Sequence, residues 1–251
     1  MQARARAAKK FFRLSRRDTS ATVRAALEKT LLLFDIDGTL IASGGAGIRA
    51  LTEAAREVFG CDELNGIDIA GRTDTSIAHQ LLARHGRERT PEAVARFGER
   101  YLTHLARFLP LTRGEVLPGV VALLDALRER PDCVLALLTG NLVRGAELKL
   151  THYGLWDYFA FGAYADDHHD RNELGPIART RALEKHGVAF APEHIFILGD
   201  TPHDITCARA FGARAIAVAT GRHTRSDLAP HAPDFLFDDL GDLSAVLAAI
   251  G

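Results

Sequence analysis

The stretch LLLFDIDGTL, at positions 31–40, constrains the fold more than any other part of this sequence. A short, continuous apolar run is typical of a strand buried on both faces, as in a parallel sheet. The run ends in Asp35, and Asp37 follows two places later. Because side chains alternate along a strand, the two carboxylates should project the same way for as long as strand geometry persists. Like charges held that close raise each other's proton affinity unless a cation intervenes, so the stretch predicts a divalent metal or a shared proton.

Composition restricts the class of protein. The chain has 251 residues, of which 25% are charged and 47% apolar, enough for a well-buried core and for two structural units. A net charge of -1 argues against nucleic acid as a partner of the whole protein. The three cysteines form no CxxC pair, which favours reduced thiols in a cytoplasmic protein. No apolar run approaches the length of a membrane-spanning helix, so no integral membrane segment is expected.

Residues 1–29 form a basic N-terminal extension, in which arginine and lysine far outnumber the two acids Asp18 and Glu28. The extension has no apolar stretch long enough for a secretion signal. Three interpretations stay open: a solvated or loosely helical tail, residues added by a start codon assigned too early, or an amphipathic segment that contacts an anionic membrane or a partner. The sequence does not identify that partner.

Residues 46–116 contain no strand-like run, and none is expected before residue 133. Apolar residues recur there at helical spacing, as at Val94, Phe97, Tyr101 and Leu105. A gap of this length is far beyond an ordinary loop in a compact domain. We therefore expect a small helical domain inserted into the fold, with flexible joints at the glycines after Ser43 and near Leu117.

The rest of the chain, residues 30–45 and 117–251, alternates strands and helices. Strands are predicted at 134–138, 158–164, 195–198, 215–219 and 235–237, and helices at 120–130, 143–153, 172–186 and 203–211. This order predicts an α/β fold: a Rossmann-like parallel sheet covered by helices on both faces. Ligands in such sheets bind at the carboxyl ends of the strands, where Asp35, Thr139 and Asp200 are expected.

Three motifs in order give the chain its family resemblance. The first is DIDGT from Asp35 to Thr39, the second is Thr139 in LLTGN, and the third is GDTPHD from Gly199 to Asp204. Together they make residues 31 to about 240 resemble the haloacid dehalogenase superfamily of hydrolases. The inserted segment resembles the helical cap of phosphoglycolate phosphatase-like members.

The resemblance implies a mechanism. Asp35 would attack phosphorus to form an aspartyl phosphate, and Asp37 would protonate the leaving alcohol and then activate water. Mg²⁺ would be held by Asp35, the backbone carbonyl of Asp37 and Asp200, with Asp204 orienting a metal-bound water.

The expected chemistry of phosphate agrees with these roles. A carboxylate about 4 Å from a phosphate dianion meets repulsion of roughly 8 kcal/mol at an effective dielectric of 20, which Mg²⁺ would offset. The Thr139 hydroxyl and the amides near Gly38 and Gly140 are candidate donors to the phosphate oxygens. Thr39 and Asn141 are further candidates for binding the substrate, and Arg72 is the candidate for contact with its remote end.

The family's usual lysine is missing from the loop after the third strand, which here reads DDHHDRNE. We expect Arg171 to take its place and bind both the nucleophile and a phosphate oxygen. The alternative is that Arg171 only offsets its acidic neighbours, with Arg144 or Arg179 next in line for the cationic role. Lys149 falls inside a predicted helix and is expected to lie elsewhere. The histidines and acids of the loop have no consistent metal-ligand spacing, so a solvated loop is the preferred interpretation.

The predicted function is therefore a Mg²⁺-dependent phosphatase that hydrolyses a small phosphorylated metabolite, with phosphoglycolate the first ester to test by resemblance. A phosphoryl mutase would use the same residues. A dehalogenase would share the fold and the nucleophile but has no use for Asp37. A catalytically idle regulatory module, acting through its basic tail, is the alternative from a different class.

Overall fold

The computed structural model describes residues 29–61 and 63–251, so the predicted tail lies outside the described residues except for Lys29. The strands are β1 (Thr30–Phe34), β2 (Ile41–Ala42), β3 (Glu115–Val116), β4 (Cys133–Leu138), β5 (Gly162–Ala163), β6 (Ile195–Gly199), β7 (Arg214–Val218) and β8 (Phe235–Phe237). The α-helices are α2 (Ala46–Phe59), α3 (Asp74–Arg84), α4 (Pro91–Phe108), α5 (Val120–Arg128), α6 (Val143–His152), α7 (Leu174–His186), α8 (Pro202–Ala210), α9 (Arg225–Leu228) and α10 (Leu243–Ile250). Short 3-10 helices lie at Leu109–Leu111, Trp156–Tyr158, Arg171–Glu173, Pro192–His194 and Ala229–His231.

A six-stranded parallel sheet forms the centre of the molecule, in the order β5-β4-β1-β6-β7-β8. Strand β1 lies between β4 and β6, so the chain leaves it first toward one edge of the sheet and later toward the other. Such a reversal point is where ligands bind in open α/β sheets. The predicted α/β class is confirmed, and the residues after β1, β4 and β6 meet at this point.

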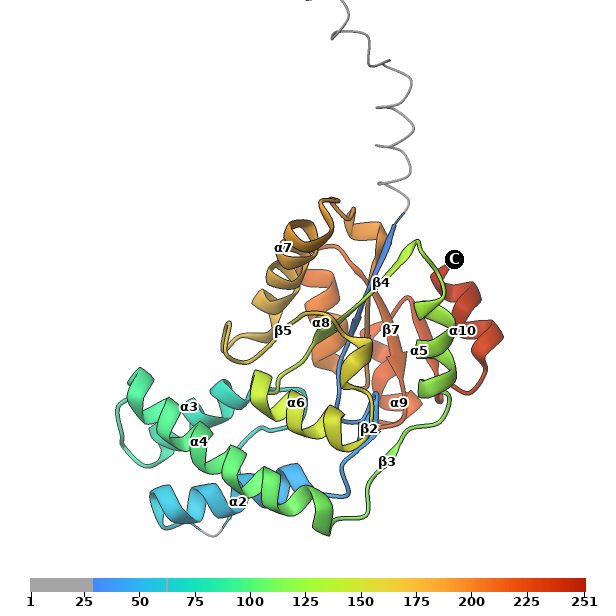
Figure 1. The fold of residues 1–251 in the computed structure, drawn as a ribbon. Coiled ribbons are helices and arrows are strands. Elements are labelled where there is room, and N and C mark those ends of the chain that lie inside the picture. The colour runs from blue at the N-terminus through green and yellow to red at the C-terminus, as the bar shows by residue number, and fades with distance from the viewer. Residues whose placement is uncertain (1–28, 62) are drawn as a thin grey trace, which may run out of the picture.

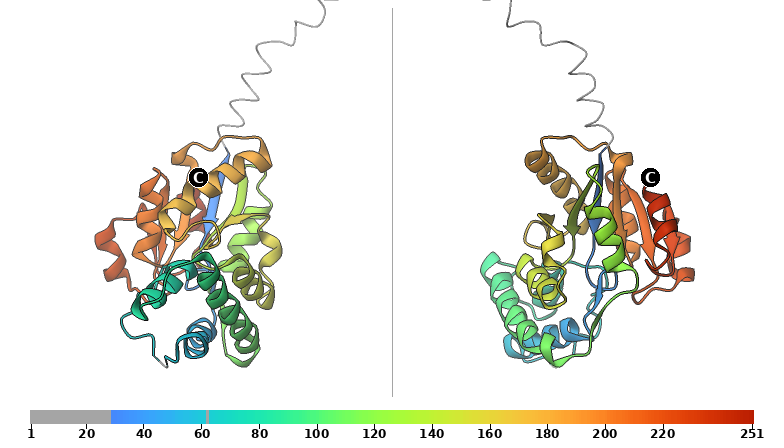
Figure 2. Two further views of the ribbon diagram at one scale, coloured as in Figure 1. Left: turned by 90° about the vertical axis from the view of Figure 1, so that its left-hand side faces the viewer. Right: turned by 45° about the vertical axis from the view of Figure 1, so that its right-hand side comes forward.

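Helices cover both faces of the sheet, and alternate side chains of β1 pack into a separate core on each face. Leu31 and Leu33 belong to the cluster that contains the buried residues of α7 and α8. Leu32 and Phe34 belong to the cluster that contains those of α5, α6 and α10. Figure 2 shows the two helical layers on opposite sides of the sheet. All five residues of β1 are buried, as the apolar run predicts.

Helices α2, α3 and α4 form a helical insert at the carboxyl end of the sheet and bury a cluster of their own (Figure 1). The chain enters and leaves the insert through β2 and β3, a two-residue antiparallel pair. The expectation of no strand before residue 133 is therefore wrong. Two residues are too few to give a periodic signal in sequence, and the pairing of Ile41 with Val116 depends on tertiary contact.

The strand predicted over 158–164 is also wrong in extent. A 3-10 helix occupies Trp156–Tyr158, and only Gly162–Ala163 pairs with β4. Strand β5 is an edge strand, and edge strands are commonly short. The helix predicted from residue 172 begins at Leu174, after a 3-10 turn whose Asp170 side chain accepts a hydrogen bond from the Asn172 amide.

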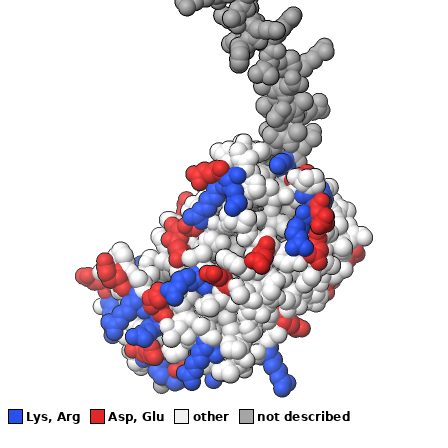
Figure 3. Space-filling model, in the orientation of Figure 1, with Lys and Arg blue, Asp and Glu red and all other residues white. Residues whose placement is uncertain are grey.

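On the face drawn in Figure 3, acidic and basic side chains are interspersed. Within the described part of the chain, no helix combines the length and the apolar character needed to cross a bilayer.

Candidate active site

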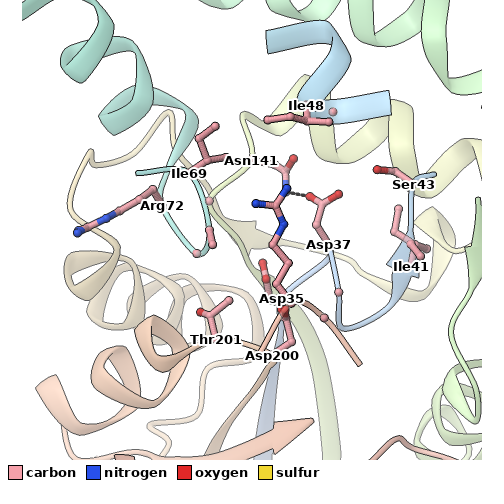
Figure 4. Close-up of a pocket in the computed structure, with 18 of the residues that line it drawn as sticks. Asp35, Asp37, Ile41, Ser43, Ile48, Ile69, Arg72, Asn141, Asp200 and Thr201 are labelled. Atoms are coloured by element: carbon pink, nitrogen blue, oxygen red, sulfur yellow. Dashed lines mark hydrogen bonds between the residues drawn. The ribbon is translucent and has the colours of Figure 1, made fainter. Parts of the chain in front are cut away.

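Three buried carboxylates converge at the carboxyl end of the sheet. Asp35 directly follows β1, Asp200 follows the neighbouring β6, and Asp204 lies in the first turn of α8. Each offers an oxygen, and these oxygens all lie within 4.8 Å of one another. Asp35 and Asp200 lie next to each other in Figure 4. The predicted convergence of the first and last motifs is therefore present in the structure.

Gly38 allows the turn after β1 to approach Asp200. Its φ of 85° lies in the left-handed region, and a Cβ atom there would lie 2.4 Å from Oδ2 of Asp200. The Thr39 hydroxyl donates to Oδ1 of Asp200 at 3.4 Å. Gly38 and Thr39 thus build the wall around Asp200. The amide of Gly38 itself donates to the carbonyl of Ile41 at 2.8 Å, and phosphate binding by the other amides near Gly38 stays a prediction.

Asp204 closes the start of α8 and faces the acid cluster at the same time. Its Oδ2 accepts hydrogen bonds from the amide of Thr201 at 3.0 Å and from the Thr201 hydroxyl at 2.7 Å, which is a capping-box arrangement. Its Oδ1 accepts a hydrogen bond from Nη2 of Arg171. Asp204 therefore serves both the start of α8 and the acid cluster.

Arg171 lies under the cluster and joins two of its acids. The same Nη2 atom is 3.1 Å from Oδ1 of Asp35, and the side chain is only 6% exposed. Burial opposes the charged guanidinium, but the charges of Asp204 and Asp35 outweigh burial and keep the Arg171 pKa above its usual value. The predicted contact with Asp35 is present. Contact with a phosphate oxygen stays a prediction.

The charge of the cluster fits a divalent cation. Burial raises the pKa of Asp35 to about 6; Arg171 opposes that shift, whereas Asp204 and Asp37 add to it. Burial, followed by Asp204 and Asp35, raises the pKa of Asp200. Three carboxylates and one guanidinium leave two uncompensated negative charges, and hard oxygen donors are the ligands that Mg²⁺ prefers. Asp35, Asp200 and Asp204 are therefore the residues that fit a metal.

Asp37 pairs with a lysine that the sequence interpretation placed elsewhere. Strand β1 ends at Phe34, so strand geometry does not persist to Asp37, yet both acids line the same cavity (Figure 4). Oδ2 of Asp37 accepts from Nζ of Lys149 at 2.5 Å and from the Asn141 side chain at 2.9 Å. The same Nζ lies 2.6 Å from Oδ1 of Asn141.

The expectation for Lys149 is thus wrong, although the sequence carried a signal. Gly145, Ala146 and Leu150 form the buried face of α6, and Lys149 lies on that face although helix lysines are rarely buried.

The two alternatives to Arg171 lie elsewhere: Arg144 binds Glu99 at 2.5 Å, and Arg179 binds the carbonyl of Phe190 at 2.9 Å.

Thr139 is fully buried at the end of β4. Its hydroxyl oxygen accepts a hydrogen bond from the Asn141 side chain at 2.8 Å and one from the Asn141 amide at 3.3 Å. Among the described residues, the hydroxyl donates no recorded hydrogen bond. Thr139 therefore orients Asn141, and its contact with phosphate stays a prediction. The carbonyl of Gly140 accepts from the amide of Asp74, which ties this turn to the helical insert.

A cavity of about 450 Å³ lies above the acids, between the sheet and the insert. Asp35, Asp37, Asn141 and Asp200 line it from the core side, and Ile48 and Ile69 line it from the insert (Figure 4). Arg72 borders it, but its side chain points away from the acids and its Nε binds Asp68 at 2.7 Å. Contact between Arg72 and the substrate remains a prediction, and it would require the side chain to turn toward the cavity.

Asp74 is a buried acid in the first turn of α3. The helix is capped by the preceding residue, Thr73, whose hydroxyl oxygen accepts a hydrogen bond from the amide of Ser76. Oδ2 of Asp74 accepts from the amide of Leu142 at 2.8 Å, across the contact between insert and core. Burial raises the pKa of Asp74 to about 7, although Lys149 and the Leu142 hydrogen bond act in the opposite direction.

Comparison with known proteins agrees with this arrangement. The family model described as haloacid dehalogenase-like hydrolase matches residues 29–212. The chain belongs to the haloacid dehalogenase-like hydrolases. A phosphoglycolate phosphatase of Synechococcus elongatus is 30% identical over 215 residues, which cover 84% of this chain and 94% of that protein. The probable phosphatase IndB of Dickeya dadantii is 28% identical over 228 residues, which cover 88% of this chain and 95% of that protein.

The solved structures extend the likeness of this haloacid dehalogenase-like hydrolase to its fold. CbbY from Rhodobacter sphaeroides, solved in complex with phosphate, superimposes with a TM-score of 0.66 at 20% identity. The match covers 86% of this chain and 96% of that one. The likeness includes the insert, because a match of this coverage cannot be made by the sheet domain alone.

Proposed function

We propose that this hydrolase is a Mg²⁺-dependent phosphatase that hydrolyses a small phosphate monoester through an aspartyl phosphate on Asp35. The observation that carries the proposal is the convergence of the oxygens of Asp35, Asp200 and Asp204 within 4.8 Å, on a cavity that also holds the Asp37–Lys149 pair. The two relatives reported above are named as a phosphatase and a probable phosphatase, which supports phosphate ester hydrolysis as the reaction class.

Asp35, Asp200 and Asp204 would hold the ion. When bound, Mg²⁺ offsets the repulsion between a carboxylate nucleophile and a phosphate dianion. Arg171 fixes Oδ1 of Asp35 from below and limits its rotation. A nucleophile held in one orientation needs no reorganisation when it attacks, which lowers the barrier.

In the first step, a carboxylate oxygen of Asp35 attacks phosphorus, and the bond from phosphorus to the alcohol oxygen breaks. Asp37 gives its proton to that leaving oxygen. In the second step, Asp37 takes a proton from water, the water oxygen attacks phosphorus, and the bond to Asp35 breaks. Inorganic phosphate leaves, and both acids return to their starting forms.

Lys149 and Asn141 position Asp37 for both steps. Their two hydrogen bonds converge on Oδ2 of Asp37, so Oδ1 is left to exchange protons with the substrate and with water. The ammonium also stabilises the carboxylate that Asp37 becomes after it donates its proton. An intact Asp37 with dedicated partners favours a phosphatase over a dehalogenase, in which this acid would have no role.

The test is release of inorganic phosphate from a panel of phosphorylated metabolites, with Mg²⁺ or with EDTA, by the natural chain and by Asp35→Asn. We expect release only with Mg²⁺ and only from the natural chain. Mg²⁺ should also raise the melting temperature of the natural chain and of the surface control Asp157→Asn, but not of Asp200→Asn. Release that persists in EDTA or in Asp35→Asn would rule out the mechanism, and transfer of phosphate to a second ester in place of water would indicate a mutase.

A further inference from the structure

The cavity above the acids has two unlike halves. The core half is charged, with Asp35, Asp37, Asp200, Lys149 and Arg171 all facing the space. The insert half is mainly apolar, with contributions from Ile48, Leu51, Ile69, Ile77 and the ring of Tyr101. Figure 4 shows Ile48 and Ile69 across the opening from the carboxylates. A phosphate ester that binds with its phosphoryl group at Asp35 would therefore have its alcohol portion in the apolar half.

The insert offers no cation to that alcohol in the described residues. Its charged residues on the cavity are Arg72, whose guanidinium is turned outward to Asp68, and Asp74, which is an acid. Of the core cations on the cavity, Lys149 binds Asp37, and Arg171 binds Asp35 and Asp204. Arg222 borders the cavity as well, but from the rim of the core and not from the insert. A carboxylate buried at the insert half would lack a counter-charge from the insert and would face Asp74, both of which disfavour binding.

We propose, on the basis of the phosphatase function proposed above, that the substrate is the phosphate monoester of an uncharged alcohol larger than glycolate, selected by the apolar wall of the insert and by Tyr101. The cavity volume of about 450 Å³ lies within the range of sites that enclose whole small metabolites.

Tyr101 supplies the polar contact for that alcohol. The residue is 2% exposed and lines the cavity, and among the described residues its hydroxyl makes no hydrogen bond. A hydroxyl on the cavity wall without a protein partner can bind a hydroxyl of the substrate in place of water. Burial, with the charges of Asp74 and Asp37, raises the pKa of Tyr101, so that its hydroxyl keeps its proton. The first turn of α2 also borders the cavity, and its amides can donate to a hydroxyl oxygen as well as to a carboxylate.

Two pairs of esters test the proposal, each matched except for a carboxylate in place of CH₂OH: phosphoglycolate against 2-hydroxyethyl phosphate, and 3-phosphoglycerate against glycerol 1-phosphate. Each ester is assayed as a substrate with Mg²⁺ and as a competitor of p-nitrophenyl phosphate, so that an ester that is not turned over still yields an affinity. We expect the neutral member of each pair to be favoured by about tenfold or more in kcat/KM or in affinity. Equal values, or a preference for the carboxylates, would overturn the proposal.

Substitutions on the wall of the cavity test which residues set the preference between neutral and carboxylate esters. Ile48→Arg places a cation on the wall at a half-exposed position and should shift the ratio toward phosphoglycolate by about tenfold, whereas Val121→Arg, exposed on α5, should leave it unchanged. Tyr101→Phe should lower kcat/KM by a larger factor for glycerol 1-phosphate than for p-nitrophenyl phosphate, whose alcohol carries no second hydroxyl.

Two further outcomes are distinct. A preference for phosphoglycolate that disappears in Arg222→Ala would overturn the proposal and assign the carboxylate to the rim of the core, where Arg222 borders the cavity. Absence of Mg²⁺-dependent phosphate release from every ester, including p-nitrophenyl phosphate, would instead refute the phosphatase function itself.

Discussion

Nζ of Lys149 lies 2.5 Å from Oδ2 of Asp37, although one residue is on the second turn of α6 and the other is in the turn after β1. The lysine side chain is 3% exposed, whereas that of Asp37 is 41% exposed. The ammonium is therefore fixed by the protein, and the acid faces the cavity. This pair gives the site a second cation beside Arg171.

Replacing that ammonium should affect turnover more than folding. We expect Lys149→Met to lower kcat/KM by about 10²- to 10³-fold, the usual effect of removing one fixed group that stabilises charge in the transition state. Lys185→Met is the matched control, because Lys185 is an exposed residue of α7 whose one hydrogen bond among the described residues goes to the carbonyl of Ala160. Steady-state kinetics on any accepted ester measures both, and a loss of less than about threefold in Lys149→Met would contradict the role.

Arg171 should be essential for stability as well as for activity. Arg171→Met leaves Asp35 and Asp204 buried without their shared counter-charge, which typically costs about 3–5 kcal/mol in the free energy of unfolding. The half-exposed pair of Arg181 with Asp167 is the comparison, and Arg181→Met should cost about 1 kcal/mol. Urea unfolding measures the difference, and similar losses in the two variants would mean that the buried network contributes no more than a surface pair.

Alanine substitutions at two glycines distinguish the cost of backbone strain from an effect on the geometry of the acid cluster. Gly38 and Gly60 both have positive φ, 85° and 69°, but a Cβ atom at Gly60 would meet nothing within 4 Å. Gly60→Ala should therefore cost only the left-handed backbone strain of about 1 kcal/mol. Gly38→Ala should cost more and should also abolish the Mg²⁺-dependent rise in melting temperature, because its Cβ would displace Asp200. Metal-dependent stabilisation that survives in Gly38→Ala would contradict the assignment of Asp200.

Asp74 should make stability depend on pH. Its pKa is about 7 in the fold and about 4 in an unfolded chain, so the unfolded state loses its proton first as pH rises. Asp74 therefore weakens the fold progressively from about pH 4 to pH 7, and the loss is complete above pH 7.

The neutral, similarly shaped Asp74→Asn removes this cost. Its gain in the free energy of unfolding over the natural chain should be larger at pH 8 than at pH 5 by roughly 2 kcal/mol. The control Asp157→Asn, at the surface, should change stability by less than about 0.5 kcal/mol at either pH. A gain of Asp74→Asn that is the same at both pH values would show that the buried acid does not titrate in this range.

The sequence by itself determined the sheet and the order of its motifs. The apolar run of β1 predicts a strand buried on both faces, because only a parallel sheet covered on both sides has a place for it. The positions of Asp35, Thr139 and Asp200 at strand ends follow from the same argument, since the carboxyl ends of parallel strands meet at one edge. The helical content of the insert is equally local, because periodicity within 91–108 is a property of that segment alone.

Only the tertiary structure decided which cations and which walls complete the site. Lys149 reaches Asp37 because β4 pairs beside β1 and α6 packs next to the cavity, and no local pattern encodes that contact. The pairing of β2 with β3 and the outward turn of Arg72 likewise depend on how the insert docks on the core. Periodicity reports which face of an element is buried, whereas specificity depends on what lies opposite that face, and this is set by contacts between residues distant in sequence.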